Sequence, residues 1–215
     1  MTPDRPAAVD WDARFAGEGY LFGTEPNAFL VSCRARLPAL GRVLCVADGE
    51  GRNSVWLAAQ GLEVVAFDAS PVGVAKATRL AEAQGVEVQY EVADADGWDW
   101  PREAFDVVAA IYIQFAPPAM RRRIFDRVWG ALSPGGLFLL EGYRLEQLGY
   151  GTGGPRVAEQ LYTEELLRDE LAAFTLEEVR SYDVLIDEGP AHSGMSAVID
   201  VVARRPDATA EATTP

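Results

Sequence analysis

The sequence predicts an α/β protein with a doubly wound sheet of about seven strands, mostly parallel with one antiparallel strand. Short apolar runs alternate with helical segments five times along the chain, which favours parallel strands joined by right-handed crossovers. The last two expected strands follow each other without a helix between them, so they must be antiparallel to each other. At 215 residues, of which 49% are hydrophobic, the chain has the size and composition of one such domain.

The expected strands before residue 141 are short apolar runs, except for 86–92, in which apolar and polar residues alternate. The helical segments between them carry capping or stop residues. The segment that begins at Pro71 shows this most clearly, because proline suits a first helical turn and Gly85 stops the helix. The strands are expected over residues 43–47, 63–67, 86–92, 105–113 and 137–140, and the helices over residues 53–60, 71–84 and 119–132.

The rest of the chain completes the sheet. Thr163 has the chemistry of a helix N-cap and is expected to open a helix that ends near residue 172. Strands are expected over 174–184 and 196–203, joined by a loop that contains Gly189 and Gly194. The domain is therefore expected to cover residues 9–205, with 9–40 as an N-terminal cap segment, between disordered ends at 1–8 and 206–215.

Composition excludes several classes of partner. The charge of 19 − 33 = −14 would repel DNA, RNA and anionic membranes. No apolar run approaches the length that spans a bilayer, and the first residues show no secretory signal, so a cytoplasmic protein is expected. Cys33 and Cys45 are isolated and have no partners at the spacing of a zinc site, so no metal is expected. A monomer or a homodimer is compatible with these properties.

The glycine-rich turn after the first strand is the leading candidate for a ligand site. Ligands of doubly wound sheets bind outside the carboxyl ends of the parallel strands, and residues 47–53 form such a strand-to-helix loop. Gly49 and Gly51 let a ligand approach the backbone. A nicotinamide dinucleotide site would need a third glycine where Ser54 stands, and its pyrophosphate would meet two carboxylates, from Asp48 and Glu50. A cationic ligand, such as a sulfonium, suits those carboxylates better; a tight turn without a ligand is the alternative.

Two further strand ends carry carboxylates. Asp68 ends the second strand, where a carboxylate can accept both hydroxyls of a ribose; its structural alternative is a helix cap or a loop aspartate. Ser70 is the better-placed N-cap, which would leave Asp68 free. Asp94 follows the third strand and can accept a hydrogen bond from an adenine amine, unless it is an ordinary loop residue. Trp98 and Trp100, just beyond, are expected to pack in the core.

From about residue 11 to residue 205 the chain resembles the class I S-adenosylmethionine-dependent methyltransferases, nearest to the small tellurite-resistance and thiopurine-type branch. The resemblance rests on 43–53 (VLCVADGEGRN), 67–70 (FDAS), Asp94, 132–136 (LSPGG) and 147–155 (QLGYGTGGP). It implies a Rossmann-like fold and S-adenosylmethionine as the cofactor. The residues that it implies for cofactor binding are Ala47, Asp48, Gly49, Glu50, Gly51, Asn53, Asp68, Ala69, Ser70, Asp94, Ala95 and Ile111.

The chain departs from the family pattern in two places. One concerns the residues that would contact the methionine part of the cofactor, and the other concerns the general base. The wider superfamily often has an acidic residue at the position of Cys45 and a glycine at the position of Ala47. The small branch often has a histidine after the fourth strand, where this chain has Gln114. Gln114, His192 and Tyr150 are the candidate catalytic residues on the acceptor side. His192, the single histidine, can equally be structural.

The activity expected is methyl transfer to a small nucleophile: a thiol, a phenol or a metalloid oxyanion. Such a displacement needs alignment and desolvation, and a general base is optional. A dinucleotide-dependent oxidoreductase and a non-catalytic cofactor-binding domain are the alternatives. The aromatic stretch 11–27 is expected either to close over the site or to pack on the sheet. The loop 147–155 has four glycines and is expected to be too flexible for a helix and to order on ligand binding, with a passive connection as the alternative.

Overall fold

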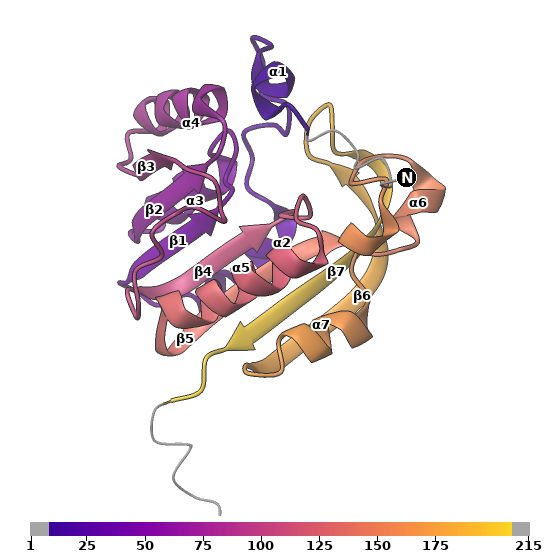
Figure 1. The fold of residues 1–215 in the computed structure, drawn as a ribbon. Coiled ribbons are helices and arrows are strands. Elements are labelled where there is room, and N and C mark those ends of the chain that lie inside the picture. The colour runs from indigo at the N-terminus through magenta and orange to yellow at the C-terminus, as the bar shows by residue number, and fades with distance from the viewer. Residues whose placement is uncertain (1–8, 208–215) are drawn as a thin grey trace, which may run out of the picture.

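The computed structural model describes residues 9–207, which form an α/β domain around a seven-stranded sheet (Figure 1). The strand order is β3-β2-β1-β4-β5-β7-β6. The strands are β1 (Arg42–Val46), β2 (Glu63–Asp68), β3 (Gln89–Val92), β4 (Phe105–Ile111), β5 (Leu132–Tyr143), β6 (Thr175–Asp187) and β7 (Ser193–Arg204). The expectations for residues 1–8 and for 208–215 of the tail lie outside the described residues.

Pairing along the sheet confirms the predicted topology. β1, β2, β3, β4 and β5 pair in parallel, whereas β7 runs antiparallel to both β5 and β6. The single reversed strand is therefore β7, and the carboxyl ends of the five paired parallel strands face the same edge of the sheet as the β6–β7 turn.

Helices cover both faces of the sheet (Figure 1). Apolar residues of α2 and α3 pack on one face, and those of α5 and α7 pack on the other. The helices are α1 (Trp11–Phe15), α2 (Ala28–Ser32), α3 (Arg52–Ala59), α4 (Pro71–Gln84), α5 (Pro118–Ala131), α6 (Gln147–Tyr150) and α7 (Glu164–Glu170), with 3₁₀ turns η1 (Cys33–Arg36) and η2 (Ala158–Gln160). None of the helices in the described part of the chain has the length and apolar character to cross a membrane.

Local capping explains which helix ends were predictable. The side chain of Ser70 accepts the N–H of Gly73 at the start of α4, and Gly85 ends the helix in the left-handed conformation. Thr163 caps α7 in the same way through the N–H of Leu166.

The extents of β3 and β5 differ most from the predictions, and β4, β6 and β7 differ by one to three residues at their ends. β5 begins at Leu132, five residues earlier than expected, because Leu132 already pairs with Phe105 of β4 before the Pro-Gly-Gly sequence. β3 begins only at Gln89, because the N–H of Val86 is used to close the end of α4 on the carbonyl of Ala81. Trp98 stacks on Phe67 at a ring distance of 4.6 Å, which confirms a packing role for that tryptophan.

Candidate functional site

The glycine-rich loop after β1 has the backbone that its sequence predicts. Ala47, Gly49 and Gly51 all have positive φ, at 50°, 62° and 93°. A Cβ on Gly51 would lie 2.6 Å from the Cβ of Ala77 in α4, so only glycine fits there. The loop therefore brings the start of α3 close against α4 at the carboxyl edge of the sheet.

Asp68, at the end of β2, holds this loop. Its Oδ2 accepts the N–H of Gly49 at 2.9 Å and its Oδ1 accepts the N–H of Ser70 at 2.8 Å. Asp68 is thus not a helix cap. The sequence suggested that its carboxylate would be free, but both oxygens accept backbone hydrogen bonds. Each carboxylate oxygen keeps a second lone pair, which is the acceptor capacity that two ribose hydroxyls require. The buried carboxylate and the tight loop therefore fit an adenosyl ligand.

Glu50 does not face a ligand, contrary to the sequence-based expectation. Its Oε1 forms an ion pair with Nζ of Lys76 at 2.7 Å, and its Oε2 accepts the N–H of Leu21 at 2.7 Å. Both charged residues are only 4% exposed. The negative charge of Glu50 is therefore neutralised within the protein and neither attracts a sulfonium nor repels a pyrophosphate.

Asp48 is also engaged inside the loop. Its Oδ2 accepts a short hydrogen bond from the hydroxyl of Ser54, which in turn contacts the hydroxyl of Tyr90 at 3.0 Å. Burial raises the pKa of Asp48 to about 7. The hydrogen bond from Ser54 opposes this shift, and repulsion from Asp68 adds to it. Repulsion by Asp48 and Glu50 is therefore no longer an argument against a dinucleotide. The remaining argument is that Ser54 stands where a dinucleotide site needs its third glycine.

Asn53 anchors the N-terminal segment. Its Oδ1 accepts the N–H of Asn27 at 3.0 Å, and both residues are buried. Leu21 of the same segment is also held, because its carbonyl accepts the N–H of Ala191, in the β6–β7 turn, at 3.1 Å. Two residues expected to contact the cofactor, Glu50 and Asn53, therefore hold the cap segment on the loop.

The cap segment lies over the glycine-rich loop, between α4 and the β6–β7 turn (Figure 1). Helix α1 brings Asp12 to the hydroxyl of Ser70 and the buried ring of Phe15 to within 3.3 Å of a Cβ built on Gly49. A ligand that approaches Gly49 from this side must displace Phe15.

The remaining predicted cofactor residues differ in exposure. Ala69 and Asp94 are exposed, and Asp94 accepts the N–H of Asp96 at 2.8 Å through one carboxylate oxygen, which leaves the other without a partner among the described residues. Ala95 is buried and its carbonyl accepts from Trp100. Ile111 ends β4 and packs against the core on the α2 and α3 face.

A polar cluster lies at the carboxyl ends of β4 and β5 beneath the cap segment. It consists of Arg52, Tyr112, Glu141, Tyr143, Glu188 and His192. The hydroxyl of Tyr112 donates to Oε1 of Glu141 at 2.7 Å, and Nη2 of Arg52 donates to Oε2 of Glu188 at 2.8 Å. The ring of His192 packs 4.5 Å from that of Tyr112, between centroids.

Several polar atoms of this cluster are buried without a hydrogen-bond partner. They are Nη1 of Arg52, Oε2 of Glu141, the hydroxyl of Tyr143 and Nδ1 of His192. Buried polar groups are rarely left unsatisfied, so four in one cluster call for a polar ligand or water.

Burial also shifts the acid–base properties of the cluster. It raises the pKa of Glu141 to about 8, with the neighbouring carboxylate of Asp200 adding to the shift. Burial lowers the pKa of His192, against the opposing effect of the Glu188 carboxylate, whose Oε2 lies 3.7 Å from Nδ1. For Glu188 burial acts upward, but contacts with His192 and Arg52 outweigh it and lower its pKa to about 2. Glu141 is the member that the sequence analysis missed; its signal was a single charge in the otherwise apolar end of a buried strand.

Gln114 is placed in a structural position. Its Nε2 donates to the carbonyls of Tyr143 and Gln160, at 2.8 and 3.1 Å, and its Oε1 accepts the N–H of Tyr143 at 2.5 Å. The amide therefore ties the loop after β4 to the end of β5, and both of its N–H donors are occupied.

Tyr150 is not brought to the polar cluster. It is 38% exposed, and its hydroxyl donates to Asp183 of β6 at 2.8 Å. The loop 147–155 also differs from expectation, because Gln147–Tyr150 form the short helix α6. The side chain of Gln147 holds this loop through Thr152 at 3.1 Å and through the N–H of Ala197 at 2.9 Å. Helix formation there follows from these tertiary bonds, which sequence propensity does not report.

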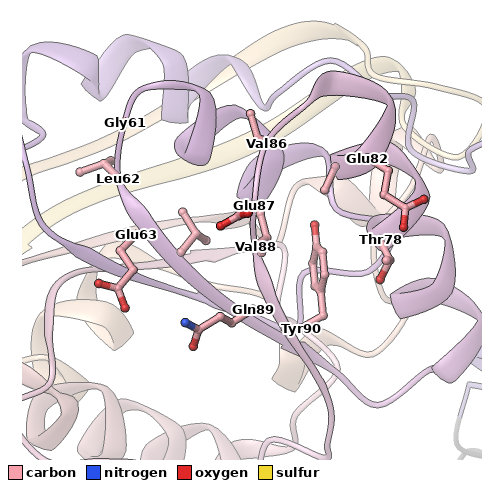
Figure 2. A pocket seen from close by; sticks show the side chains of 12 residues that line it. Gly61, Leu62, Glu63, Thr78, Glu82, Val86, Glu87, Val88, Gln89 and Tyr90 are labelled. Carbon is pink, nitrogen blue, oxygen red and sulfur yellow. The ribbon is translucent and has the colours of Figure 1, made fainter.

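A surface cavity of about 610 Å³ lies elsewhere on the domain. Figure 2 shows Leu62, Val88 and Tyr90 around it with the acidic side chains of Glu63 and Glu82. These residues precede or begin β2 and β3 or lie on α4, so most of the lining is at the amino ends of the strands. None of the predicted site residues lines this cavity, which is therefore distinct from the glycine-rich loop.

Comparison with known proteins agrees with this arrangement. A family model described as a methyltransferase domain matches residues 43–136. A demethylmenaquinone methyltransferase from Thermus thermophilus is 39% identical over 103 residues, 46% of each chain. A carboxy-S-adenosyl-L-methionine synthase from Yersinia pestis is 36% identical over 83 residues, 38% of this chain and 31% of the relative. The chain thus spans less than half the length of these curated relatives.

Solved structures extend the likeness in fold to nearly the whole chain. One, from work on the conversion of a disulfide bond into a thioacetal group during echinomycin biosynthesis, has a TM-score of 0.77 at 20% identity, over 94% of this chain and 92% of that one. TehB from Haemophilus influenzae has a TM-score of 0.68 at 14% identity, over 83% and 62%. Residues 43–136, which include the loop and Asp68, therefore match a methyltransferase domain, and the chain has the fold of solved methyltransferase structures.

Proposed function

We propose that the protein transfers the methyl group of S-adenosylmethionine to a small-molecule nucleophile, such as a thiol, a phenol or a metalloid oxyanion. The observation that carries this proposal is the pairing of Asp68 with the backbone of the glycine-rich loop, within the segment that matches the methyltransferase domain. The relative from Thermus thermophilus is named for the acceptor demethylmenaquinone, which is neither a protein nor a nucleic acid.

The residues around the loop have distinct roles under this proposal. The free lone pairs of Asp68 accept the ribose hydroxyls, and the exposed carboxylate of Asp94 is available to the adenine amine. Gly49 and Gly51 allow the close backbone approach. S-adenosylmethionine supplies an electrophilic methyl group on a sulfonium, and the chain positions it and excludes water.

The cap segment supplies the exclusion of water. Three hydrogen bonds attach it: Asp12 binds Ser70 at the start of α4, Leu21 binds Glu50, and Asn27 binds Asn53. For the ligand to enter, α1 must lift so that Phe15 leaves Gly49, and the bonds to Glu50 and Asn53 keep the far end of the segment attached. Lids of this kind keep reactive intermediates from water once they close again.

A non-catalytic cofactor-binding domain is the second candidate, and one observation favours it. Glu141, Tyr143 and His192, on the presumed acceptor side, are each no more than 6% exposed, as in a pocket that has been filled. A catalytic site under a closed lid would be equally buried, so a measurement of turnover has to distinguish the enzyme from the non-catalytic domain. The dinucleotide-dependent oxidoreductase is disfavoured by Ser54 in place of the third glycine and by the family match.

The test is a methyl-transfer assay that detects S-adenosylhomocysteine release across phenols, thiols, thiopurines, tellurite and selenite. Release with one acceptor class supports the enzyme. Tight binding of S-adenosylhomocysteine without release from any acceptor supports the non-catalytic domain.

A further inference from the structure

We propose that Glu141 is the catalytic base of this site and that the acceptor is a neutral phenol or thiol, whose proton passes to Oε2 of Glu141. Tyr112 is the positioning residue that aims the carboxylate. The inference rests on the proposed methyl transfer and narrows its acceptor class.

The first argument is the state of the two carboxylate oxygens. Glu141 is 3% exposed at the carboxyl end of β5. Its Oε1 accepts the hydroxyl of Tyr112 at 2.7 Å, whereas Oε2 is buried without a partner. The side chain of Asn27 lies near enough to lower the pKa of Glu141, but no described donor reaches Oε2 with hydrogen-bond geometry. A buried carboxylate oxygen without such a donor is costly, so a further proton donor fits there. An acceptor hydroxyl or thiol is such a donor.

The second argument is the backbone of Tyr112. It is one of three described non-glycine residues with positive φ, at 57°, and it is a bulky residue for that conformation. Its N–H donates to the carbonyl of Glu141 at 2.8 Å, and its hydroxyl reaches the carboxylate of the same residue. Strain of this kind persists where the surroundings impose it and is concentrated at active sites.

The third argument is what surrounds the unpartnered oxygen. Nη1 of Arg52, the hydroxyl of Tyr143 and Nδ1 of His192 are also buried without partners in the same cluster. These groups can hold the polar part of an acceptor. The rings of Phe22 and Tyr112 pack on His192, both at 4.5 Å between centroids, and give the cluster aromatic walls.

Charge selects against an anionic acceptor. Three carboxylates face this region: those of Glu141, Glu188 and Asp200, the last opposite Glu141 in the β5–β7 pair. Arg52 is paired with Glu188, and Arg180 with Asp200, each at 2.8 Å. Two of the three carboxylates are thus paired and that of Glu141 is not, so a tellurite or selenite anion would be repelled by ionised Glu141, whereas a neutral phenol or thiol would not.

The proton transfer balances the charges of the reaction. A lone pair on the acceptor oxygen or sulfur forms the bond to the methyl carbon, and the electron pair of the carbon–sulfur bond stays on sulfur. The proton of the acceptor forms a bond to Oε2 of Glu141. A carboxylate and a sulfonium thus become a neutral carboxyl and a neutral thioether, which a buried site favours over separated charges.

The acid–base properties of Glu141 agree with this role. Burial, followed by repulsion from Asp200, raises its pKa to about 8. The hydrogen bond from Tyr112 opposes this shift, and repulsion from Glu188 adds to it. A base with a pKa near the working pH transfers protons efficiently. Activity should therefore rise with pH up to about 8 as Glu141 loses its proton.

The experiment measures kcat/KM against pH with 4-methylphenol and phenylmethanethiol as acceptors, because both keep their proton at the pH where Glu141 becomes ionised. Glu141→Gln keeps the shape and an acceptor for Tyr112 but cannot take a proton. We expect a loss of roughly 10²–10⁴-fold, as for other general bases, with unchanged S-adenosylhomocysteine affinity. Asp200→Asn is the matched control: it removes the neighbouring charge, so the pH profile should shift to lower pH with its plateau kept.

Infrared difference spectroscopy gives a readout that does not depend on turnover. In the wild type the protonated-carboxyl band should lose one component as the pH rises through about 7, from Asp48, and another through about 8, from Glu141, and Glu141→Gln should lack only the second. Glu141→Gln with wild-type turnover and pH profile would overturn the inference while methyl transfer stands. Turnover with selenite or tellurite but with neither 4-methylphenol nor phenylmethanethiol would overturn it as well. No binding of S-adenosylhomocysteine by the wild type would overturn both proposals.

Discussion

Glu50 and Lys76 form an ion pair of 2.7 Å that is almost entirely buried between the glycine-rich loop and α4. The same two side chains hold the cap segment, because Oε2 of Glu50 accepts the N–H of Leu21 and Nζ of Lys76 donates to the carbonyl of Gly19 at 2.6 Å. One buried pair therefore connects the presumed cofactor loop with the segment that covers it.

Breaking this pair should destabilise the fold strongly. Lys76→Met leaves Glu50 buried without its counter-ion, which costs about 3–5 kcal/mol for a pair of this kind. Urea denaturation should show this loss in the free energy of unfolding, and hydrogen exchange should become faster at residues 19–21. The matched control is Glu63→Gln, which breaks the exposed pair with Arg42 and should cost less than about 1 kcal/mol. Equal effects of the two substitutions would contradict the role given to Lys76.

Asp68→Ala should affect both binding and folding. It removes the acceptor for ribose and also the acceptor for the N–H groups of Gly49 and Ser70. We expect S-adenosylhomocysteine affinity to fall at least tenfold, and the free energy of unfolding of the ligand-free protein to fall by about 1–3 kcal/mol per unsatisfied group. Thr163→Ala is the control, because loss of this remote N-cap costs about 1 kcal/mol without touching the loop. An unchanged affinity in Asp68→Ala would leave Asp68 with a purely structural role.

The raised pKa of Asp48 predicts a pH dependence of stability. Because the folded state holds the proton more tightly than the unfolded state, the stabilising contribution is complete below pH 4 and is lost as the pH rises to about 7. Compared with Asp48→Asn, the wild type should therefore lose stability over this window, by at most about 1.4 kcal/mol per pH unit.

Ser54→Ala provides the internal check on this prediction. The hydrogen bond from Ser54 lowers the pKa of Asp48, so its removal should extend the window to higher pH. Unfolding free energies measured from pH 4 to pH 8 decide the matter. A difference between wild type and Asp48→Asn that does not change with pH would refute the prediction.

Gln114 and Tyr150 should behave differently from catalytic residues. Gln114→Leu leaves the N–H of Tyr143 and the carbonyl of Gln160 without their partner, so stability should fall by about 1–3 kcal/mol per group left buried and unsatisfied. Tyr150→Phe loses one exposed hydrogen bond to Asp183, and turnover and stability should remain close to wild type. Steady-state kinetics and thermal melts of the two variants test this. Abolished turnover in Tyr150→Phe would return that residue to the acceptor side.

The fold was predictable where local signals and topology agree. α4 was predicted to the residue because Ser70, Pro71 and Gly85 mark its ends. The reversed β7 followed from the lack of a helix after β6. The extent of β5 was not predictable, because pairing with β4 and β7 extends that strand through a Pro-Gly-Gly sequence that ordinarily marks a turn.

The position of the site was predictable, but the contacts of its residues were not. The glycine-rich loop and Asp68 meet as the strand-end rule implies. The partner of Glu50 is Lys76, on the next helix, and nothing local marks that pairing. Glu141 was not predicted because it lies just beyond the apolar run 137–140, and only the fold brings Tyr112 to it.

Calorimetric titration of the protein with S-adenosylhomocysteine, and separately with NAD, tests the central claim most directly. The arrangement of Asp68 and the glycine-rich loop predicts saturable binding of S-adenosylhomocysteine at one site per chain, weakened at least tenfold in Asp68→Ala, and no response to NAD. Binding of NAD without any response to S-adenosylhomocysteine would contradict it.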